Sequence, residues 1–218
     1  MMSTVAIVGA GPGLGAAVAE RFGREGLAVA LIARNLAKLD KLAEGLSAQG
    51  IAAKAYAADV HDRDGLSRAL AAAADEIGMI EVLQYSPVPR SEFLRPLLET
   101  SVDDLAAAVE FSVYGSATAV QQVLPCMTAL GRGTILFVNG SSAVTPNPNV
   151  TGTSVAFAAE SAYGQMLHDT LSEQNIHVGQ LIVPGAIRDD DPVFAPKVLA
   201  DRLWQIHTAK GPYRVTVG

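Results

Sequence analysis

Charge of either sign is scarce in this sequence, cysteine occurs once, and no hydrophobic run is long enough to cross a membrane. Only 17% of the 218 residues are charged, the net charge is −6, and there is no basic cluster, which disfavours a nucleic-acid partner. The single Cys126 excludes a disulfide within the chain and fits a reducing compartment. A membrane helix needs roughly 20 apolar residues, and the segment MMSTVAIVGAG lacks the charged start of a signal peptide. We therefore expect a cytoplasmic protein with no membrane partner.

Half of the residues are hydrophobic, and they form short apolar runs that alternate with longer helical patterns. Near-continuously apolar strands are typical of a parallel sheet covered by helices. Because no linker divides the chain, residues 1–218 are predicted to form one Rossmann-type α/β domain, with a doubly wound, mainly parallel seven-stranded sheet and helices on both faces. The predicted strands are residues 4–10, 27–34, 51–60, 80–86, 134–140, 178–185 and 213–217. The predicted helices are about 14–25, 36–49, 62–77, 101–129, 153–174 and 196–209.

The stretch GAGPGLG joins the first predicted strand to the first predicted helix. Glycines let the backbone turn sharply and approach a phosphate, and the helix that follows offers free N–H groups and a positive dipole end. The spacing is GxxxGxG rather than GxGxxG. A tight turn without a ligand is the alternative. We predict a phosphate-binding loop made of Gly9, Gly11, Pro12, Gly13, Leu14 and Gly15.

The residues after the second and third predicted strands bear on the choice of nucleotide. Dinucleotide sites often place an acid at the end of the second strand, whereas an Arg there accommodates the 2′-phosphate of NADP. Here the strand ends in Arg34 and Asn35, which favours NADP(H) over NAD(H), although Arg34 could simply be solvated. Asp59, followed by Val60, could accept a hydrogen bond from the adenine amino group. Asp59 could equally cap the next helix.

Three loops, residues 86–96, 145–153 and 187–196, follow predicted strands at the carboxyl edge of the sheet, where open α/β sheets bind ligands. The last loop contains Asp189, Asp190 and Asp191. No His or Glu lies near them, so we interpret them as a solvated acidic run and expect no metal site.

Over nearly its full length the chain resembles the short-chain dehydrogenase/reductase family. The matching features are Gly9, Gly13 and Gly15; the pair Asp59 and Val60; and the stretch from Pro125 to Ser142, followed by Pro184 and Gly185. The resemblance implies a nicotinamide cofactor whose ring lies near Pro184 and Gly185. We assign Ser86 and Ile187 to the same cofactor site. The matching helices of the family pair across a two-fold axis, which implies a homodimer.

The resemblance also implies a catalytic set of Asn, Ser, Tyr and Lys. In that set the Tyr donates a proton to the substrate carbonyl, the Lys binds the nicotinamide ribose and lowers the pKa of the Tyr, and the Ser orients the substrate. Ser142 matches the family's serine. The other three positions depart from it: Phe157 replaces the Tyr, Ser161 the Lys and Ser112 the Asn. A phenyl ring has no proton to give, so the family's acid–base step cannot run here.

Two hypotheses follow, and whether the chain is an enzyme stays open between them. The first is an atypical NADP(H)-dependent oxidoreductase acting on a carbonyl or alcohol. Ser142 would orient its small-molecule substrate, and water, Tyr85 or Tyr114 would supply the proton. The second is a catalytically silent NADP(H)-binding protein that senses the nucleotide or supports a partner.

Overall fold

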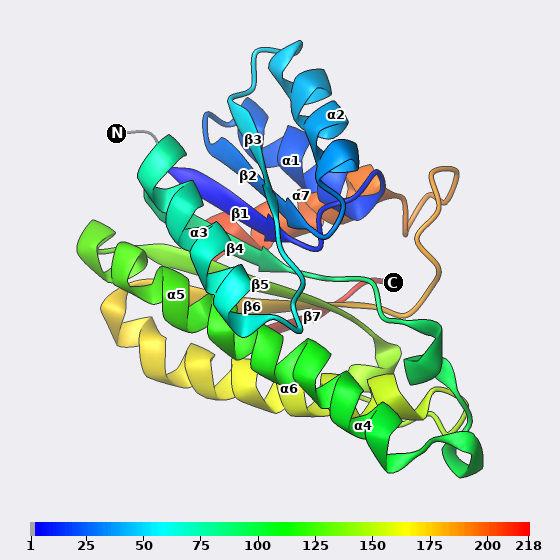
Figure 1. The fold of residues 1–218 in the computed structure, drawn as a ribbon. Helices are drawn as coiled ribbons and strands as arrows, with labels where there is room; N and C mark the ends of the chain where they lie inside the picture. The colour runs from blue at the N-terminus through cyan, green and yellow to red at the C-terminus, as the bar shows by residue number, and fades with distance from the viewer. Residues whose placement is uncertain (1–2) are drawn as a thin grey trace.

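The computed structural model describes residues 3–218. Seven strands form one sheet in the order β3-β2-β1-β4-β5-β6-β7, and each adjacent pair is parallel (Figure 1). This order confirms the doubly wound Rossmann-type fold. The chain reverses its direction of winding between β1 and β4, which opens a crevice at their carboxyl ends. The strands are β1 Thr4–Val8, β2 Ala28–Ala33, β3 Ala53–Ala57, β4 Ile80–Tyr85, β5 Gly133–Gly140, β6 Ile176–Val183 and β7 Arg214–Thr216.

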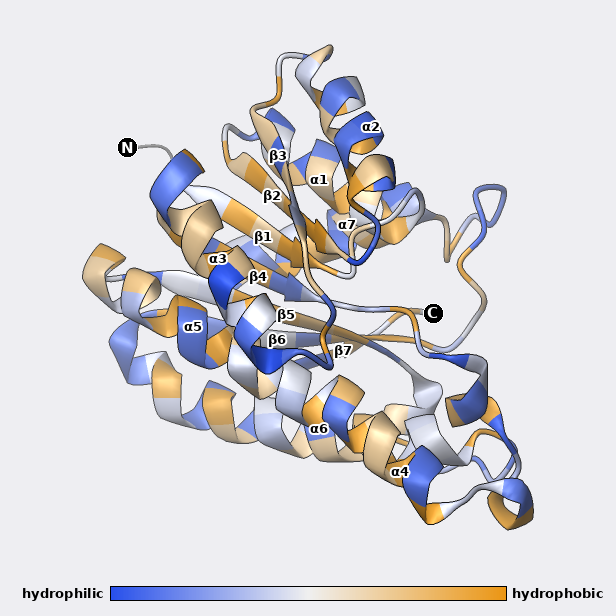
Figure 2. Ribbon diagram, in the orientation of Figure 1, coloured by the Kyte–Doolittle hydropathy of each residue, from blue (hydrophilic) through white to orange (hydrophobic). Residues whose placement is uncertain are grey.

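Helices cover both faces of the sheet (Figure 1). One core joins the sheet to α1, α2 and α7, and the other joins it to α3, α5 and α6. Strands β1 and β6 are buried along their whole length, and Figure 2 shows the central strands as largely hydrophobic. Within residues 3–218, no helix has the length and apolar character needed to span a membrane. The helices are α1 Leu14–Arg24, α2 Leu36–Ser47, α3 Arg63–Ile77, α4 Val102–Val109, α5 Gly115–Leu130, α6 Thr151–Leu171 and α7 Pro196–Ala209.

Side-chain caps set several helix starts. The Asn35 side chain accepts from the Lys38 N–H at the start of α2, and Asp62 accepts from the Gly65 N–H at the start of α3. Asp62 therefore caps α3, and the alternative prediction that Asp59 caps this helix is wrong. Asp59 lies in the loop between β3 and α3 and is available to the site.

The predicted helix 101–129 is divided in two. A π-helical turn, η3 Glu110–Tyr114, separates α4 from α5. Short 3-10 turns account for other irregular segments: η1 Ser91–Leu94, η2 Leu97–Glu99, η4 Ser141–Ala143 and η5 Ser172–Gln174.

Candidate functional site

The glycine-rich loop is held tightly at its two ends and open in its middle. Gly9 has a φ of 93°, and a Cβ there would lie 2.5 Å from the Pro87 Cα atom. A Cβ on Gly15 would lie 2.9 Å from the Ala10 Cα atom. Gly11 and Gly13 would meet nothing within 4 Å. The loop therefore has close backbone packing at each end and free space before α1, as a phosphate-binding loop requires.

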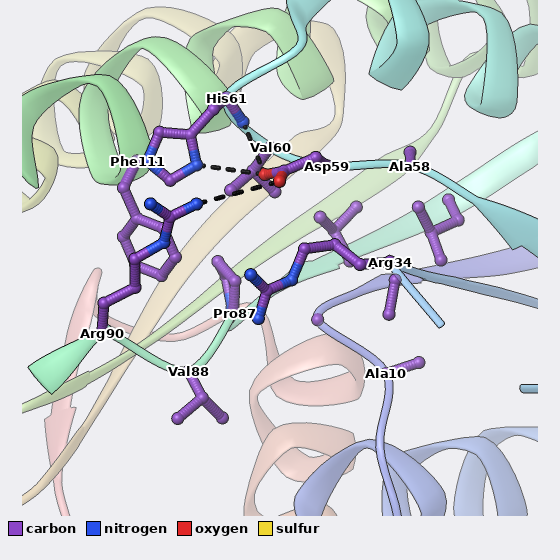
Figure 3. Close-up of a pocket in the computed structure, with 14 residues that line it drawn as sticks. Ala10, Arg34, Ala58, Asp59, Val60, His61, Pro87, Val88, Arg90 and Phe111 are labelled. Atoms are coloured by element: carbon purple, nitrogen blue, oxygen red, sulfur yellow. Dashed lines mark hydrogen bonds and ion pairs between the residues drawn. The ribbon is translucent and has the colours of Figure 1, made fainter. Parts of the chain in front are cut away.

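A pocket of about 160 Å³ lies beside this loop, at the ends of β2, β3 and β4 (Figure 3). Arg34 enters it from the end of β2, Asp59 and His61 from the end of β3, and Arg90 from the loop after β4. Figure 3 shows Arg34 and Arg90 reaching toward the same space as Asp59. Val60 also lines the pocket, whereas Asn35 does not, because its side chain caps α2. The sequence predicted Arg34, Asp59 and Val60 here, and the structure brings them together.

Two neighbours hold the Asp59 carboxylate. Its Oδ1 atom accepts from the His61 backbone N–H at 3.1 Å and lies 3.0 Å from His61 Nδ1. Its Oδ2 atom lies 3.9 Å from an Arg90 nitrogen. Burial alone would raise the pKa of Asp59, but the His61 hydrogen bonds and the charge of Arg34 outweigh it and lower the pKa. Asp59 is thus an ionised acceptor at the wall of the pocket.

A second, larger cavity of about 610 Å³ adjoins the loop on its other side. It brings together Ser142 and most of the predicted cofactor-binding residues: Gly9, Gly11, Pro12, Gly13, Leu14, Gly15, Ser86, Pro184, Gly185 and Ile187. Phe157 of α6 forms part of its wall. The two cavities share Gly9, Pro87 and Val88, so the start of the loop lies between the smaller pocket and the larger cavity.

Phe157 and Ser161 differ in their surroundings. Phe157 lines the large cavity, but Ser161 is buried beneath it. The Ser161 hydroxyl donates to Gln180 Oε1 at 2.8 Å and accepts from an Arg214 nitrogen at 2.6 Å. The position of the family's lysine is therefore occupied by a hydroxyl that a cation from β7 already contacts.

The Ser161 contacts continue into a buried polar chain. Gln180 Nε2 donates to Asn139 Oδ1 at 2.8 Å, and Asn139 Nδ2 donates to Glu160 Oε1 at 3.1 Å. Burial raises the pKa of Glu160 to about 8, against the hydrogen bond from Asn139, which lowers it. Sequence reasoning missed Glu160, Arg214, His61 and Arg90. For Glu160, the available signal was a glutamate inside the run of small residues FAAESA.

Neither tyrosine proposed as a substitute acid lines either cavity. The Tyr85 hydroxyl donates to the Phe111 carbonyl, and the side chain is 1% exposed. Burial raises the pKa of Tyr85 well above its ordinary value, and the charges of Glu160 and Asp59 add to this. Tyr114 is 46% exposed, and its ring lies under the Arg63 guanidinium. These positions disfavour both residues as proton donors.

Two further groups of polar residues, a pair of histidines and the acidic run, line neither cavity. His168 and His177 contact each other and Val178 of β6, not the lining of either cavity. In the acidic run, Asp191 accepts from the backbone N–H groups of Val193 and Phe194. Within residues 3–218, no cluster of His, Cys, Asp and Glu could hold a metal ion.

A family model described as short chain dehydrogenase matches residues 3–191. The chain belongs to the short-chain dehydrogenase family. It is 31% identical over 186 residues to the 2,3-dihydro-2,3-dihydroxybenzoate dehydrogenase of Bacillus subtilis, which covers 84% of this chain and 69% of that protein. It spans smaller shares of other relatives, such as 11% of a glycine betaine reductase of Emericella nidulans and 60% of a short-chain dehydrogenase of Pseudocercospora fijiensis.

Solved structures of short-chain dehydrogenases have the same fold. One from Rhodopseudomonas palustris superimposes with a TM-score of 0.88 and 25% identity, over 99% of this chain and 98% of that one. A metagenomic short-chain oxidoreductase in complex with NADP superimposes with a TM-score of 0.85 and 23% identity, over 99% and 97% of the chains. The chain thus belongs to a family of NAD(P)-dependent oxidoreductases and shares its fold.

Proposed function

We propose that this short-chain dehydrogenase is an NADP(H)-dependent oxidoreductase that acts on a carbonyl or alcohol substrate. The observation that carries the proposal is Arg34, which enters the smaller pocket at the end of a β2 strand that has no acid there. A guanidinium in this place favours the 2′-phosphate of NADP(H), whereas a carboxylate would favour NAD(H). The loop from Gly9 to Gly15 would hold the pyrophosphate, and Asp59 the adenine amino group.

The cofactor, when bound, supplies the hydride chemistry. The residues of the chain itself would bind the cofactor and orient the substrate. Pro184, Gly185 and Ile187 would border the nicotinamide. The Ser142 hydroxyl, which makes no hydrogen bond within residues 3–218, would donate to the substrate oxygen. Since Phe157 holds no proton, water would supply it.

A catalytically silent NADP(H)-binding protein is the second candidate. The observation that favours it is the Ser161 hydroxyl, which is bound between Gln180 and Arg214 and leaves no lysine to orient a nicotinamide ribose. The two candidates share the cofactor site and differ only in turnover.

Fluorescence titration with NADPH and NADH tests the shared part. We expect NADPH to bind more tightly than NADH, and Arg34→Ala to remove most of that difference. Arg24→Ala, on the exposed end of α1, is the matched control. If neither nucleotide binds, the proposed function is wrong. If NADPH binds and a carbonyl screen yields no turnover, the silent candidate is favoured.

We also propose a homodimer formed through the outer faces of α5 and α6, and a cytoplasmic location. Val155 and Met166 on α6 are 46% and 61% exposed, which leaves apolar surface on this face of the helix. Light scattering on Met166→Glu would test the dimer, since a buried charge at a two-fold interface should yield monomers.

A further inference from the structure

The large cavity has a wall without charge. Its lining is mainly glycine, proline and apolar side chains, among them Leu94, Val150, Phe157 and Ile187. None of the lining residues that the structure describes is an Asp, Glu, Lys, Arg or His. The free N–H groups at the start of α1 would bind the pyrophosphate of the cofactor, but a charged group on a substrate elsewhere in the cavity would have no opposite charge to pair with, which is costly. The reacting end of the substrate is therefore uncharged.

Most polar side chains in this wall are already engaged. Thr153 Oγ1 donates to the Val150 carbonyl, and Asn147 Oδ1 accepts from the Asn149 N–H. Asn139 is bound on both sides, by Gln180 and Glu160. Ser142 and the exposed Ser141 keep hydroxyls with no hydrogen bond within residues 3–218. The cavity can thus orient a carbonyl oxygen with a neutral donor, and it offers no group that titrates.

The absence of an acid restricts which carbonyls can be reduced. Hydride addition to an isolated ketone leaves an alkoxide, about as basic as hydroxide, the conjugate base of water with a pKa near 15.7. Hydride transfer to one carbonyl oxygen of a quinone sends the electron pair through the ring to the other oxygen and leaves a phenolate, the conjugate base of a group with a pKa of about 10. The second anion is about five to six orders of magnitude less basic, so it needs no acid at the site and takes its proton from water afterwards.

We propose that the substrate of this site is an uncharged, flat, conjugated dicarbonyl compound of the quinone class. The inference rests on the proposed NADP(H)-dependent function. The reaction balances as quinone, NADPH and one proton giving hydroquinone and NADP⁺. The C–H bond of the dihydronicotinamide breaks and an O–H bond forms at one quinone oxygen, so the quinone gains two electrons and NADPH loses them. The other oxygen, left as a phenolate, takes its proton from water. Phe157 supplies an apolar aromatic face for the ring, where a tyrosine hydroxyl is not needed.

Three probes of one skeleton test the proposal with NADPH under nitrogen, with enzyme-free blanks. They are a naphthoquinone methylated at both free quinone carbons, its ring-sulfonated derivative, and tetralone, the matched compound with one carbonyl. Since general acids contribute about 100-fold or more, we expect kcat/KM for the neutral quinone to exceed that for tetralone by about that factor. The sulfonated quinone should be reduced with a lower kcat/KM than the neutral quinone. Equal rates on tetralone and the neutral quinone would overturn the proposal.

The variant Phe157→Tyr separates acid catalysis from binding. We expect it to raise tetralone reduction by about tenfold and to leave quinone reduction within about twofold, because only the alkoxide needs the new donor. A parallel rise for both substrates would contradict the proposal.

Thermal unfolding with NADP⁺ gives a readout that is independent of turnover. The neutral quinone should stabilise the protein further, Val150→Asp should abolish that increment, and Val102→Asp should retain it. Val102 is 80% exposed at the start of α4 and serves as the matched control. If NADPH binds but the quinone neither stabilises the protein nor is reduced, the substrate class is wrong and the cofactor assignment stands. If NADPH itself does not bind, the proposed function fails first.

Discussion

Ser161 occupies the position where the resemblance places a lysine, and the side chain of Arg214 on β7 contacts it. The Arg214 guanidinium contacts Ser161 Oγ at 2.6 Å and Gln180 Oε1 at 2.9 Å. A lysine at 161 would share this space with Arg214. Restoring the tyrosine and the lysine at positions 157 and 161 alone would therefore bring two like charges together.

We predict that the variant Phe157→Tyr, Ser161→Lys is destabilised by about 3 kcal/mol or more, because a lysine at the buried position 161 would lack an acidic partner and would lie beside Arg214. Adding Arg214→Leu should restore most of the stability and permit reduction of tetralone. Adding Arg202→Leu, on the exposed face of α7, should restore neither. Urea unfolding and ketone turnover measure the two effects, and equal stability of all three variants would show that Arg214 does not oppose a lysine.

Arg90 lies beside Asp59, the proposed acceptor for the adenine, and lines the same pocket as Arg34. A guanidinium over an aromatic face stabilises by about 0.5–1 kcal/mol at an exposed site. We predict that Arg90→Ala weakens NADPH and NADH binding alike, by about two- to fivefold. Arg95→Ala, whose side chain pairs with Asp104, is the control. Calorimetry that found a loss confined to NADPH would instead assign Arg90 to the 2′-phosphate.

At the scale of elements, the loops after β1 and β4 pack against each other at the crevice. The Gly9 backbone is left-handed and touches the backbone of Ser86 and Pro87. An additional carbon at this point has nowhere to go, because each neighbour is main chain. The mutual position of the two loops therefore depends on this one glycine.

Gly9→Ala should destabilise the fold by about 1–3 kcal/mol through backbone strain, with the clash adding to it. Gly11→Ala should change stability by much less, since its Cβ would meet nothing within 4 Å. Chemical denaturation of both variants without nucleotide measures this difference. Equal midpoints would mean that the loops move apart at little cost.

Apolar periodicity predicted the elements well because the central strands are buried on both faces and the helices on one. It placed each of the seven strands and extended some of them too far: the prediction 51–60 became Ala53–Ala57, and 4–10 became Thr4–Val8. Glycines and alanines gave no signal at these strand ends. The π-helical turn at Glu110–Tyr114 was not predicted either, because a turn of this type keeps the helical pattern of apolar residues.

At the scale of the whole molecule, two buried groups oppose each other in their response to pH. The Glu160 carboxyl has a folded pKa of about 8, above its ordinary 4.5, because of burial. Its stabilising effect is complete below pH 4.5 and is lost as pH rises through about 8. Burial, with the charges of His168, Lys210 and His207, lowers the pKa of His177 from 6.5 to about 4. Its contribution is present above pH 6.5 and is lost as pH falls through about 4.

We therefore predict a broad stability maximum between about pH 4.5 and 6.5. Glu160→Gln should remove the decline above pH 6.5, where a tenfold difference in proton affinity between the folded and unfolded chains corresponds to about 1.4 kcal/mol. His177→Leu should remove the acid decline, and the exposed Glu99→Gln should change neither. Denaturation midpoints of the wild type and the three variants, measured across this pH range, test these predictions. A Glu160→Gln profile parallel to that of the wild type would contradict the assignment.

The site divides into what chain order reveals and what only folding reveals. The glycine loop, Arg34, Asp59 and Ser142 each follow a strand, and parallel strands end at one edge, so their meeting could be predicted. The links from Arg214 to Glu160 join β7, β6, β5 and α6, and no spacing in the sequence specifies them. The position of Tyr85 at a strand end predicted an accessible hydroxyl, but in the structure this hydroxyl points inward and donates to the Phe111 carbonyl.

The segment between β6 and α7, residues 184–195, consists of turns and extended backbone without a helix, and several of its residues line or border the large cavity. A ligand there has no ordered cover that must open before it departs. Its residence time should follow from its direct contacts alone, so that a variant with weaker binding shows a faster release and an unchanged rate of capture. Stopped-flow traces for NADPH would then be single exponentials, since no slower opening step precedes departure.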